Sequence, residues 1–385
     1  MKFFNNLEKA TFTDRPNRFL LNCDLEGKNI DVFLPNPGRL HELLFPGTTV
    51  YVTSDNYNES RRTKYTAVFI IKDNIPVMVH THKSNEIVKY LIEKKLVPTL
   101  ENATVKSSEI TCGKSRFDFL LKQGMEELYL EVKSCTLFGE KICMFPDAIT
   151  ERGRKHLKEL SHMTEKNIKT CVLFLIHCYR AEYFLPDYHT DLLFGQTFLE
   201  CNNVNVIPLA IEWKEDLSFS GKTKILTVPR KVIEQEAKDR GSYMILMELK
   251  EKKHIETGKM GKLFFEPAFY VYTGSAMAHL TQRISRHRRL RKKHHWHIDY
   301  FREHADIIAD FPVRTSEDLE CDIAEAISKI ADFSVKNFGS SDCKCESHLF
   351  GFRKNPLLTK EFIKVIQYFR MDRLETVIGE QLHKR

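Results

Sequence analysis

Long apolar stretches are missing from this sequence of 385 residues. No window of eighteen residues is continuously apolar, so a membrane-spanning helix is not expected. The opening residues MKFFNNLEKATFTDRPNRF have neither the apolar centre nor the small-residue cleavage site of a secretory signal. We therefore expect a cytoplasmic protein that has no membrane partner.

A disulfide pattern is also lacking, although the chain has ten cysteines. Seven of them are scattered singly, and several sit inside apolar runs, as Cys171 does in CVLFLIHC. A thiol in such a run behaves as a small buried hydrophobic group. Without a secretory signal, the economical interpretation is a reduced, cytoplasmic protein. Cys321, Cys343 and Cys345 near the far end pose a separate question.

The charge is unevenly distributed around a formal net value of +7. Residues 1–240 carry 34 Lys and Arg against 32 Asp and Glu, whereas residues 241–385 carry 25 against 20. Between Leu280 and Ile298 there are seven Lys or Arg and no acidic residue. Such a basic block attracts a polyanion, most often nucleic acid. A solvated helix face is the alternative interpretation.

Residues 1–82 predict a small β-barrel. Four short segments have the composition of strands and are separated by turns such as residues 35–38; these segments are RFLLNCDLE, KNIDVFLP, TTVYVTS and TAVFIIK. Several short strands joined by Gly/Pro turns are typical of an OB-like barrel, the usual nucleic-acid binder of this size. A β-barrel without a ligand would have the same pattern.

Residues 83–229 predict an α/β domain. The apolar residues of SNEIVKYLIEKKL fall on one helical face, which Ser84 is placed to cap. Strands are expected at SRFDFLLK and ELYLEVKS, and a helix at ERGRKHLKELSHM. The apolar run TCVLFLIHCY indicates a strand buried on both faces. A second helix, from Thr190 to Cys201, and the strand VNVIPLAIEW complete the domain.

Three further segments complete an α/β multidomain chain. RKVIEQEAKDR, in residues 230–240, is highly charged and predicts a linker. Residues 241–352 predict another α/β domain, with the strands SYMILMELK and FYVYTGS, a basic helix and the helix LECDIAEAISKI. EFIKVIQYFRMDRLETVIGEQL, in residues 353–385, predicts an amphipathic tail helix that is a candidate contact for a homodimer.

A first candidate site combines Asp118, Glu131 and Lys133. Asp118 lies between two phenylalanines in SRFDFLLK, and Glu131 and Lys133 point from the same face of a neighbouring strand. Two carboxylates that converge from adjacent strands suit Mg²⁺ (or Mn²⁺). A lysine beside them can orient an attacking water and offset charge on a phosphate, as phosphodiester hydrolysis requires. A structural ion pair is the alternative.

The neighbourhood of this site resembles the sugar fermentation stimulation protein A (SfsA) family. The resemblance rests on FLL and EVKSCTL, on FPDAITERGRKHLKEL after them, and on NRFLLNCDLEG and PNPGRLHELLFPG nearer the start. Over residues 1–228 it implies an OB-like DNA-binding barrel and a PD-(D/E)XK restriction-endonuclease-like core. It also implies that Asp118 and Glu131 bind the metal and that Lys133 is catalytic.

The same resemblance implies contacts to nucleic acid. Arg152 and Lys155 lie on the helix that flanks the site. Arg39, a further expected contact, ends the turn Asn-Pro-Gly-Arg, where the family usually has Asn-Thr-Gly. The acid that the first helix of such nucleases supplies has three candidates, which are Glu86, Glu93 and Glu109.

A second candidate site resembles the GIY-YIG nuclease pattern over residues 241–352. The pattern's two strand motifs match Gly241-Ser242-Tyr243 and Tyr270-Val271-Tyr272-Thr273-Gly274, with a serine where isoleucine is expected in the first. The resemblance implies that Tyr243 and Tyr272 act near the nucleophile, that Arg283 contacts phosphate, and that Glu320 binds a metal. Ordinary strand tyrosines and a surface arginine are the alternative.

The basic block and the late cysteines suggest further contacts. Seven cations from Arg283 onward are expected on one short helix without a compensating acid, and four of them are candidate nucleic-acid contacts: Arg286, Arg288, Arg289 and Lys292. Cys343, Cys345 and His348 could ligate Zn²⁺, with or without Cys321 as a fourth ligand. Their C-x-C-x₂-H spacing is tighter than in usual structural sites, so a metal-free turn is the alternative.

The sequence therefore predicts a DNA-binding, Mg²⁺-dependent nuclease with a second nuclease-like site. The alternative from another class is a non-catalytic, largely sequence-nonspecific DNA-binding regulator of sugar metabolism genes, the role proposed for the SfsA family. An RNA-directed nuclease is a third hypothesis, because the phosphate backbone supplies most of the affinity for either nucleic acid. DNA is preferred to RNA on the family resemblance.

Overall fold

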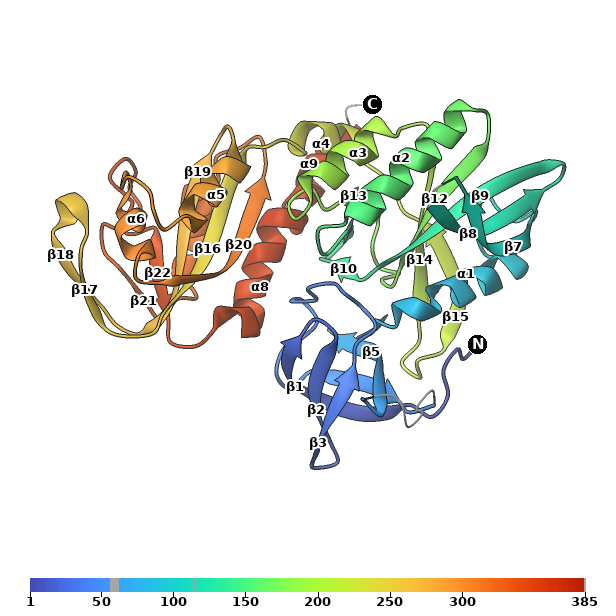
Figure 1. Cartoon of the computed structure of the whole chain (residues 1–385), viewed down its shortest axis with the longest axis horizontal. Helices are drawn as coiled ribbons and strands as arrows, with labels where there is room; N and C mark the ends of the chain where they lie inside the picture. The colour runs from blue at the N-terminus through green and yellow to red at the C-terminus, as the bar shows by residue number, and fades with distance from the viewer. Residues whose placement is uncertain (56–61, 114, 384–385) are drawn as a thin grey trace. The chain divides into compact units, whose positions relative to one another are not determined.

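The computed structural model describes residues 1–55, 62–113 and 115–383. The chain forms two compact units, Met1–Ile233 with Ile378–Arg385, and Glu234–Val377. The division between them falls inside the charged segment that the sequence predicts as a linker. Figure 1 labels the elements of each unit. No helix in the described part of the chain is long and apolar enough to cross a bilayer.

The first unit begins with a closed barrel, which confirms the OB-like prediction. Its strands are β1 (Glu8–Asn17), β2 (Leu20–Leu25), β3 (Lys28–Phe33), β4 (Thr49–Thr53), β5 (Tyr65–Lys72) and β6 (Ile75–Met78). They pair in the order β3-β2-β1-β4-β5-β6, and a parallel pairing of β3 with β5 closes a ring of five strands. This is the strand number of an OB-like barrel.

The sequence missed the first of these strands. In β1 only Ala10 and Phe12 are fully buried, and most of the strand is exposed. A strand is recognised by alternating apolar residues, and this one has too few of them to give that signal. Its place is set by pairing with β2 and β4 on either side.

The second part of this unit is a six-stranded mixed sheet, with the strand order β15-β14-β12-β9-β8-β7. The strands are β7 (Ala103–Cys112), β8 (Ser115–Gln123), β9 (Glu126–Cys135), β12 (Lys169–Ile176), β14 (Asn205–Trp213) and β15 (Phe219–Ile225). The central strands β9, β12 and β14 run parallel, and the outer pairings are antiparallel. β12 is buried along all but its first residue because both faces of the sheet are covered, as its apolar run predicts.

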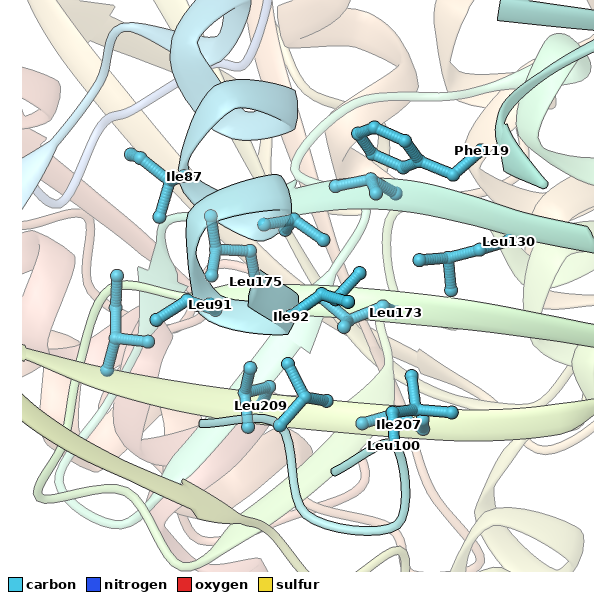
Figure 2. Close-up of a cluster of buried hydrophobic side chains, with 14 of the residues drawn as sticks. Ile87, Leu91, Ile92, Leu100, Phe119, Leu130, Leu173, Leu175, Ile207 and Leu209 are labelled. Carbon is cyan, nitrogen blue, oxygen red and sulfur yellow. The ribbon is translucent and has the colours of Figure 1, made fainter. Parts of the chain in front are cut away.

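The helix α1 (Ser84–Glu93) covers one face of this sheet. Its buried residues, Ile87 and Ile92 among them, recur at helical spacing. Figure 2 shows this helix lying across the strands, with Leu130, Leu173 and Leu209 from the three parallel strands beneath it. This face of the sheet therefore carries a large apolar core under α1.

The helices α2 (Glu151–Glu165) and α3 (Leu192–Glu200) lie on the other face (Figure 1). Thr150 caps α2, since its Oγ1 accepts the N–H of Gly153 at 3.0 Å. A small three-stranded sheet packs here, formed by β10 (Leu137–Phe138), β11 (Ile142–Phe145) and β13 (Tyr183–Pro186). Phe174 of β12 contacts Phe145 and Phe184 with ring centroids 5.3 and 4.4 Å apart. Aromatic packing thus holds this layer on the sheet.

The barrel and the sheet share one hydrophobic core. Phe69 of β5 packs on Trp213 of β14 with 5.0 Å between the ring centroids, and Met78 joins the cluster under α1. The backbone N–H of Leu40, in the barrel, donates to Asp147 of the α/β part at 2.7 Å. The two segments that the sequence predicts as separate domains are therefore packed into one unit.

The second unit is built on an antiparallel sheet in the order β20-β16-β19-β22-β21. Its strands are β16 (Gly241–Leu249), β19 (Ala268–Ala276), β20 (Asp306–Arg314), β21 (Phe333–Ser334) and β22 (Leu349–Phe352). Its other elements are the ribbon β17 (Lys253–Glu256) and β18 (Lys262–Phe265) and the helices α5 (Leu280–Arg288), α6 (His297–Arg302) and α7 (Glu320–Ser328). The helix α4 (Arg230–Glu236) spans the division between the units.

The tail is not the single helix that the sequence predicts. It consists of α8 (Lys360–Gln367), a π-helical turn over Tyr368–Asp372 and α9 (Leu374–His383). Phe362 of α8 is fully buried against Phe311 and Phe352 of the sheet. The apolar face of α8 is therefore covered by its own chain. The homodimer stays a prediction and would need another surface.

Candidate active site

Two strands of the first unit separate at the residues that the sequence singles out. β8 and β9 pair as far as Phe119 and Leu130, and the ladder stops there. Asp118 and Glu131 are the next residues on the two strands. Oδ2 of Asp118 accepts the backbone N–H of Val132 at 2.7 Å, so a side chain replaces the missing backbone partner. Both carboxylates therefore lie at the same fork in the sheet.

Glu131 is held by two basic side chains. Its Oε1 accepts hydrogen bonds from Nζ of Lys133 and from Nδ1 of His156. His156 comes from α2, is 4% exposed and packs edge-on against Phe117. The other oxygen of Glu131, Oε2, is buried and has no hydrogen-bond partner among the described residues. One carboxylate oxygen is thus fixed and the other is left unsatisfied.

The two carboxyl groups have opposite electrostatic environments. Burial, and then the charge of Glu131, raises the pKa of Asp118 above its ordinary value. Burial also acts to raise the pKa of Glu131, but the hydrogen bond from His156 and the charge of Lys133 outweigh it and lower that pKa. The negative charge at the fork is therefore stabilised on Glu131 and unfavourable on Asp118.

Both carboxylates line a cavity of about 440 Å³. Lys133 and Arg152 line it as well, together with residues 36–38 of the barrel. The cavity therefore belongs to the barrel and the sheet jointly, and it brings acidic and basic side chains together around one space.

Ser84 also lines this cavity and corrects one prediction. A short 3₁₀ turn, Thr81–Lys83, precedes α1, so Ser84 is the first residue of the helix and its side chain makes no capping hydrogen bond. Its Oγ is buried without a hydrogen-bond partner among the described residues. The cavity thus has a second unsatisfied oxygen in its wall.

The predicted nucleic-acid contacts of this unit differ in their position. Arg152 lies on the cavity wall, with Nε 3.4 Å from Nε2 of His156. Lys155 is exposed, lies 3.7 Å from Glu159 and is outside the lining, as is Arg39. The exposed Arg18 lines the cavity, although no sequence motif pointed to it.

An asparagine takes the place expected for an acid on the first helix. Asn85 Nδ2 donates to Oδ1 of Asp118 at 2.8 Å. Glu86, Glu93 and Glu109 are exposed, and none of the three is in the cavity lining. Sequence reasoning missed both Asn85 and His156. For His156 there was a weak signal, because it lies four residues after Arg152 on one face of a helix.

In the second unit the predicted tyrosines lie together. The rings of Tyr243 and Tyr272 are 6.3 Å apart, and Oη of Tyr243 is 2.8 Å from Nε2 of His287. Burial raises the pKa of both tyrosines and lowers the pKa of His287 to about 3. Nδ1 of His287 lies 3.9 Å from Asp299, which favours the tautomer with the proton on Nδ1. Tyr243 then donates its O–H to Nε2.

Arg283 and Glu320 border the same cluster. The charges of both act on Tyr243, and the Arg283 guanidinium stacks over Trp296 at 4.3 Å from the ring centroid. Ser275 Oγ donates to Oε2 of Glu320 at 2.6 Å, and burial raises the pKa of Glu320. The four residues of the second candidate site are therefore neighbours in space.

The sequence predicts that the basic block forms one helix with no compensating acid. The structure shows that this prediction is wrong on both points. α5 ends at Arg288, and the later cations follow in a loop. The fully buried Asp299 of α6 accepts hydrogen bonds from Arg286 at 2.9 and 3.0 Å and pairs with Lys292 at 2.9 Å. Asp310 of β20 pairs with Arg288. Folding thus brings acids from later segments, which a local charge count cannot see.

The late cysteines and His348 form a cluster in this unit. Ligand atoms of Cys321, Cys343, Cys345 and His348 all lie within 4.8 Å of one another. These side chains could hold a metal ion, and they are separate from Asp118 and Glu131.

The fold and these sites define an α/β multidomain protein with an OB-like barrel, a core built on a mixed sheet and a further α/β domain. Three families match the chain in that order. Residues 13–79 match the SfsA N-terminal OB domain, and residues 82–217 match the sugar fermentation stimulation protein RE domain. Residues 242–371 match the domain of unknown function DUF123, in the part that resembles GIY-YIG nucleases.

Relatives and a solved structure agree with these matches. The chain is 40% identical to a sugar fermentation stimulation protein homolog of Methanosphaera stadtmanae, over 58% of this chain and 96% of the relative. A homolog of Desulfitobacterium hafniense is 34% identical, over 57% and 95%. The structure of Pyrococcus furiosus SfsA in complex with Ca²⁺ has a TM-score of 0.52 and 25% identity, over 58% and 96%. The chain therefore belongs to the sugar fermentation stimulation protein family.

Proposed function

We propose that the first unit is a Mg²⁺-dependent (or Mn²⁺-dependent) nuclease that hydrolyses phosphodiester bonds in DNA, with its active centre at Asp118, Glu131 and Lys133. The observation that carries this proposal is the unsatisfied Oε2 of Glu131, buried beside Asp118 in the wall of the cavity. A buried charged oxygen without a partner is costly, and such groups call for an explanation by an ion or a function.

The side chains at the fork fit a hard divalent cation. Asp118 and Glu131 would hold it, because two carboxylates in an open cavity supply oxygen ligands and leave room for the waters that Mg²⁺ retains. The SfsA of Pyrococcus furiosus is in complex with Ca²⁺, another cation that prefers oxygen ligands. When bound, such a cation polarises a phosphate oxygen and lowers the pKa of a bound water.

The other residues of the site have separable tasks. Lys133 would orient the attacking water or offset negative charge on the phosphate, since its amine lies at Oε1 of Glu131. His156 is a positioning residue, because it fixes Oε1 of Glu131 and leaves Oε2 unsatisfied. Arg152, on the same wall, would contact a phosphate oxygen.

The substrate class follows from the two parts that share the cavity. Residues 36–38 of the barrel line it, so a nucleic-acid strand bound by the barrel would reach the carboxylates directly. Phosphate contacts are blind to sequence, so binding should depend on salt more than on sequence. We expect DNA rather than RNA, in the reducing cytoplasm, which suits a chain with ten free thiols.

The test is cleavage of labelled duplex DNA, single-stranded DNA and RNA by the purified full chain, with Mg²⁺, Mn²⁺, Ca²⁺ or EDTA. We expect cleavage with Mg²⁺ or Mn²⁺ that Asp118→Asn and Glu131→Gln remove while DNA binding persists. Intact DNA binding without cleavage of any substrate would instead support a non-catalytic DNA-binding regulator.

We propose a second reaction centre in the second unit, favoured by the hydrogen bond from Tyr243 to His287. His287 accepts the O–H of Tyr243 and so fixes the phenol oxygen, whose free lone pair can accept a hydrogen bond from a nucleophile and orient it. Arg283 would contact phosphate, and Glu320 would hold a divalent cation. Cleavage that survives Asp118→Asn and disappears with Tyr243→Phe would assign activity to this unit. Cleavage unaffected by Tyr243→Phe and Glu320→Gln would exclude it.

A further inference from the structure

The second unit brings three thiols and one imidazole to a single point. Cys321 lies in the first turn of α7, Cys343 and Cys345 lie in the irregular segment before β22, and His348 immediately precedes that strand. Their ligand atoms are all within 4.8 Å of one another, and Sγ of Cys343 is 3.2 Å from Nε2 of His348. We propose that these four residues form a structural zinc site.

The donor set selects the metal. Thiolates and a neutral imidazole are soft or borderline ligands, which favour Zn²⁺ over the Mg²⁺ or Ca²⁺ that carboxylates bind. Four protein ligands without a free position are typical of structural zinc. In a tetrahedral site with Zn–S bonds of about 2.3 Å, two sulfurs lie about 3.8 Å apart. The cluster is therefore within about 1 Å of the required size before any metal draws it together.

The imidazole of His348 is already oriented for this task. His348 is 1% exposed, and its Nδ1 lies 2.8 Å from Oγ1 of Thr273 and 3.4 Å from Oε1 of Glu320. A carboxylate can only accept, so these neighbours favour the proton on Nδ1 and leave the lone pair of Nε2 facing Cys343. Zinc-ligating histidines are held in this way through the ring nitrogen that does not bind the metal.

The backbone around His348 is fixed as well. The N–H of Thr273 donates to the carbonyl of His348 at 3.0 Å, and the N–H of His348 donates to the carbonyl of Phe338 at 2.8 Å. A Cβ on Gly339 would lie 3.2 Å from Cβ of His348, so the loop passes close over this residue. One ligand is thus rigid, while the two cysteines of the irregular segment can adjust to the metal.

Zinc at this position would join two parts of the unit that are distant in sequence. It would fasten the segment before β22 to α7 through Cys321. Cys321 is the residue after Glu320 in the sequence, and Nδ1 of His348 lies 3.4 Å from Oε1 of Glu320. The ion would therefore also fix the carboxylate that borders Tyr243 and Arg283, without belonging to that site. A structural zinc contributes folding free energy directly.

The first experiment is elemental analysis of the full chain, purified without chelator from zinc-supplemented cells. We expect about one zinc per chain. Cys345→Ser and His348→Ala should lose most of it, while Cys112→Ser, a half-buried cysteine of the first unit, should keep it. Full zinc content in Cys345→Ser, or iron in place of zinc in the wild type, would overturn the proposal.

A second measurement does not depend on how the variants fold. The wild-type chain, stripped of metal under reducing conditions, should bind one Co²⁺ and show thiolate-to-cobalt charge transfer together with the strong d–d bands of a tetrahedral site. A thiol-specific reagent should release zinc in proportion to the thiols modified. A native disulfide among Cys321, Cys343 and Cys345, or a Co²⁺ spectrum without thiolate bands, would contradict it.

Discussion

Oδ2 of Asp118 accepts the backbone N–H of Val132 at 2.7 Å, one residue beyond the last backbone pair of β8 and β9. The carboxylate thus serves two purposes, since it closes the fork between the strands and faces the cavity. Its raised pKa, caused by burial and by Glu131, means that the ionised form opposes folding when no cation is present.

Asp118→Asn should therefore separate stability from function. Its amide oxygen can still accept the N–H of Val132, its NH₂ can donate to the oxygen of Asn85 once that side chain flips, and the unfavourable buried charge is gone. A carboxyl whose folded pKa is raised lowers stability as the pH rises through that pKa, so at pH 7 the variant should melt no lower than the wild type. Thermal unfolding monitored by circular dichroism is the measurement. A large drop in the melting temperature would contradict it.

Divalent cations should stabilise the first unit of the wild type and leave the first unit of Asp118→Asn almost unchanged. At a Ca²⁺ concentration a hundredfold above Kd, linkage predicts about 2.7 kcal/mol of stabilisation. Glu325→Gln serves as a control, because it removes an exposed carboxylate of the second unit that belongs to neither candidate site. Equal shifts in the wild type and in Asp118→Asn would show that the cation binds elsewhere.

Loss of His156 should destabilise the first unit. Its buried hydrogen bond to Glu131 is charge-assisted, so His156→Ala should lower the free energy of unfolding by about 2 kcal/mol at pH 7. Glu131 has a lowered folded pKa, so its contribution to stability is present above its ordinary pKa and is lost as the pH falls through the folded value. The free energy of unfolding should therefore fall less at acid pH in His156→Ala than in the wild type.

Denaturant titrations at several pH values measure both effects. His162→Ala is the matched control, since His162 lies on the same helix but is exposed and contacts Glu165 at 3.2 Å. The role of His156 would be refuted by equal stability losses in the two variants.

Two lysines that the sequence places near the site should behave differently. Lys133 is bonded to Glu131 in the cavity wall, whereas Lys155 is exposed beside Glu159. Lys133→Met should reduce kcat at least about a hundredfold, as loss of a proton-transfer or charge-stabilising group does. Lys155→Met should leave kcat unchanged and weaken DNA binding at most slightly. Single-turnover cleavage rates of the two variants test this prediction. If Lys133→Met and Lys155→Met slow cleavage equally, Lys133 has no special role in the mechanism.

The exposed cations of the basic block should govern the binding of nucleic acid by the second unit. Lys292 is excluded from this group, because its side chain is 6% exposed and pairs with Asp299. Replacing Arg289, Arg291 and Lys293 by glutamine should weaken DNA binding. It should also flatten the plot of log affinity against log salt by about 0.9 per lost phosphate contact.

The control removes the same charge elsewhere on this unit. Lys329, Lys336 and Lys354 are exposed and lie outside the basic block. If their joint replacement flattens the salt dependence as much, net charge and not the basic block is responsible.

Asp299 should be a structural residue of the second unit. Asp299→Asn leaves the half-buried Arg286 and the buried Lys292 side chain without their counter-charge and should cost about 3 kcal/mol. Asp310→Asn, which breaks an ion pair with the half-exposed Arg288, should cost about 1 kcal/mol or less. Hydrogen exchange of the second unit measures the stability loss of each variant. Similar losses in Asp299→Asn and Asp310→Asn would contradict the prediction.

Much of the fold and part of the first site can be predicted from the sequence, because the signals for them are local. Alternating apolar residues defined the strands of Asp118 and Glu131, and a continuous apolar run defined β12. The two-residue spacing of Glu131 and Lys133 put both on one face of a strand. Side-chain direction along a strand depends on neighbours in sequence, so these features needed no knowledge of packing.

The distant side chains that complete each site are known only from the three-dimensional fold. Asn85 reaches Asp118 because α1 crosses the sheet, and His156 reaches Glu131 because α2 covers the other face. Asp299 neutralises the basic block from the helix that follows it. Cys321 joins the late cysteines because α7 packs against β19 and so lies beside the segment that precedes β22. These partners are set by the packing of whole elements, which depends on long-range burial and leaves no periodic trace in the sequence.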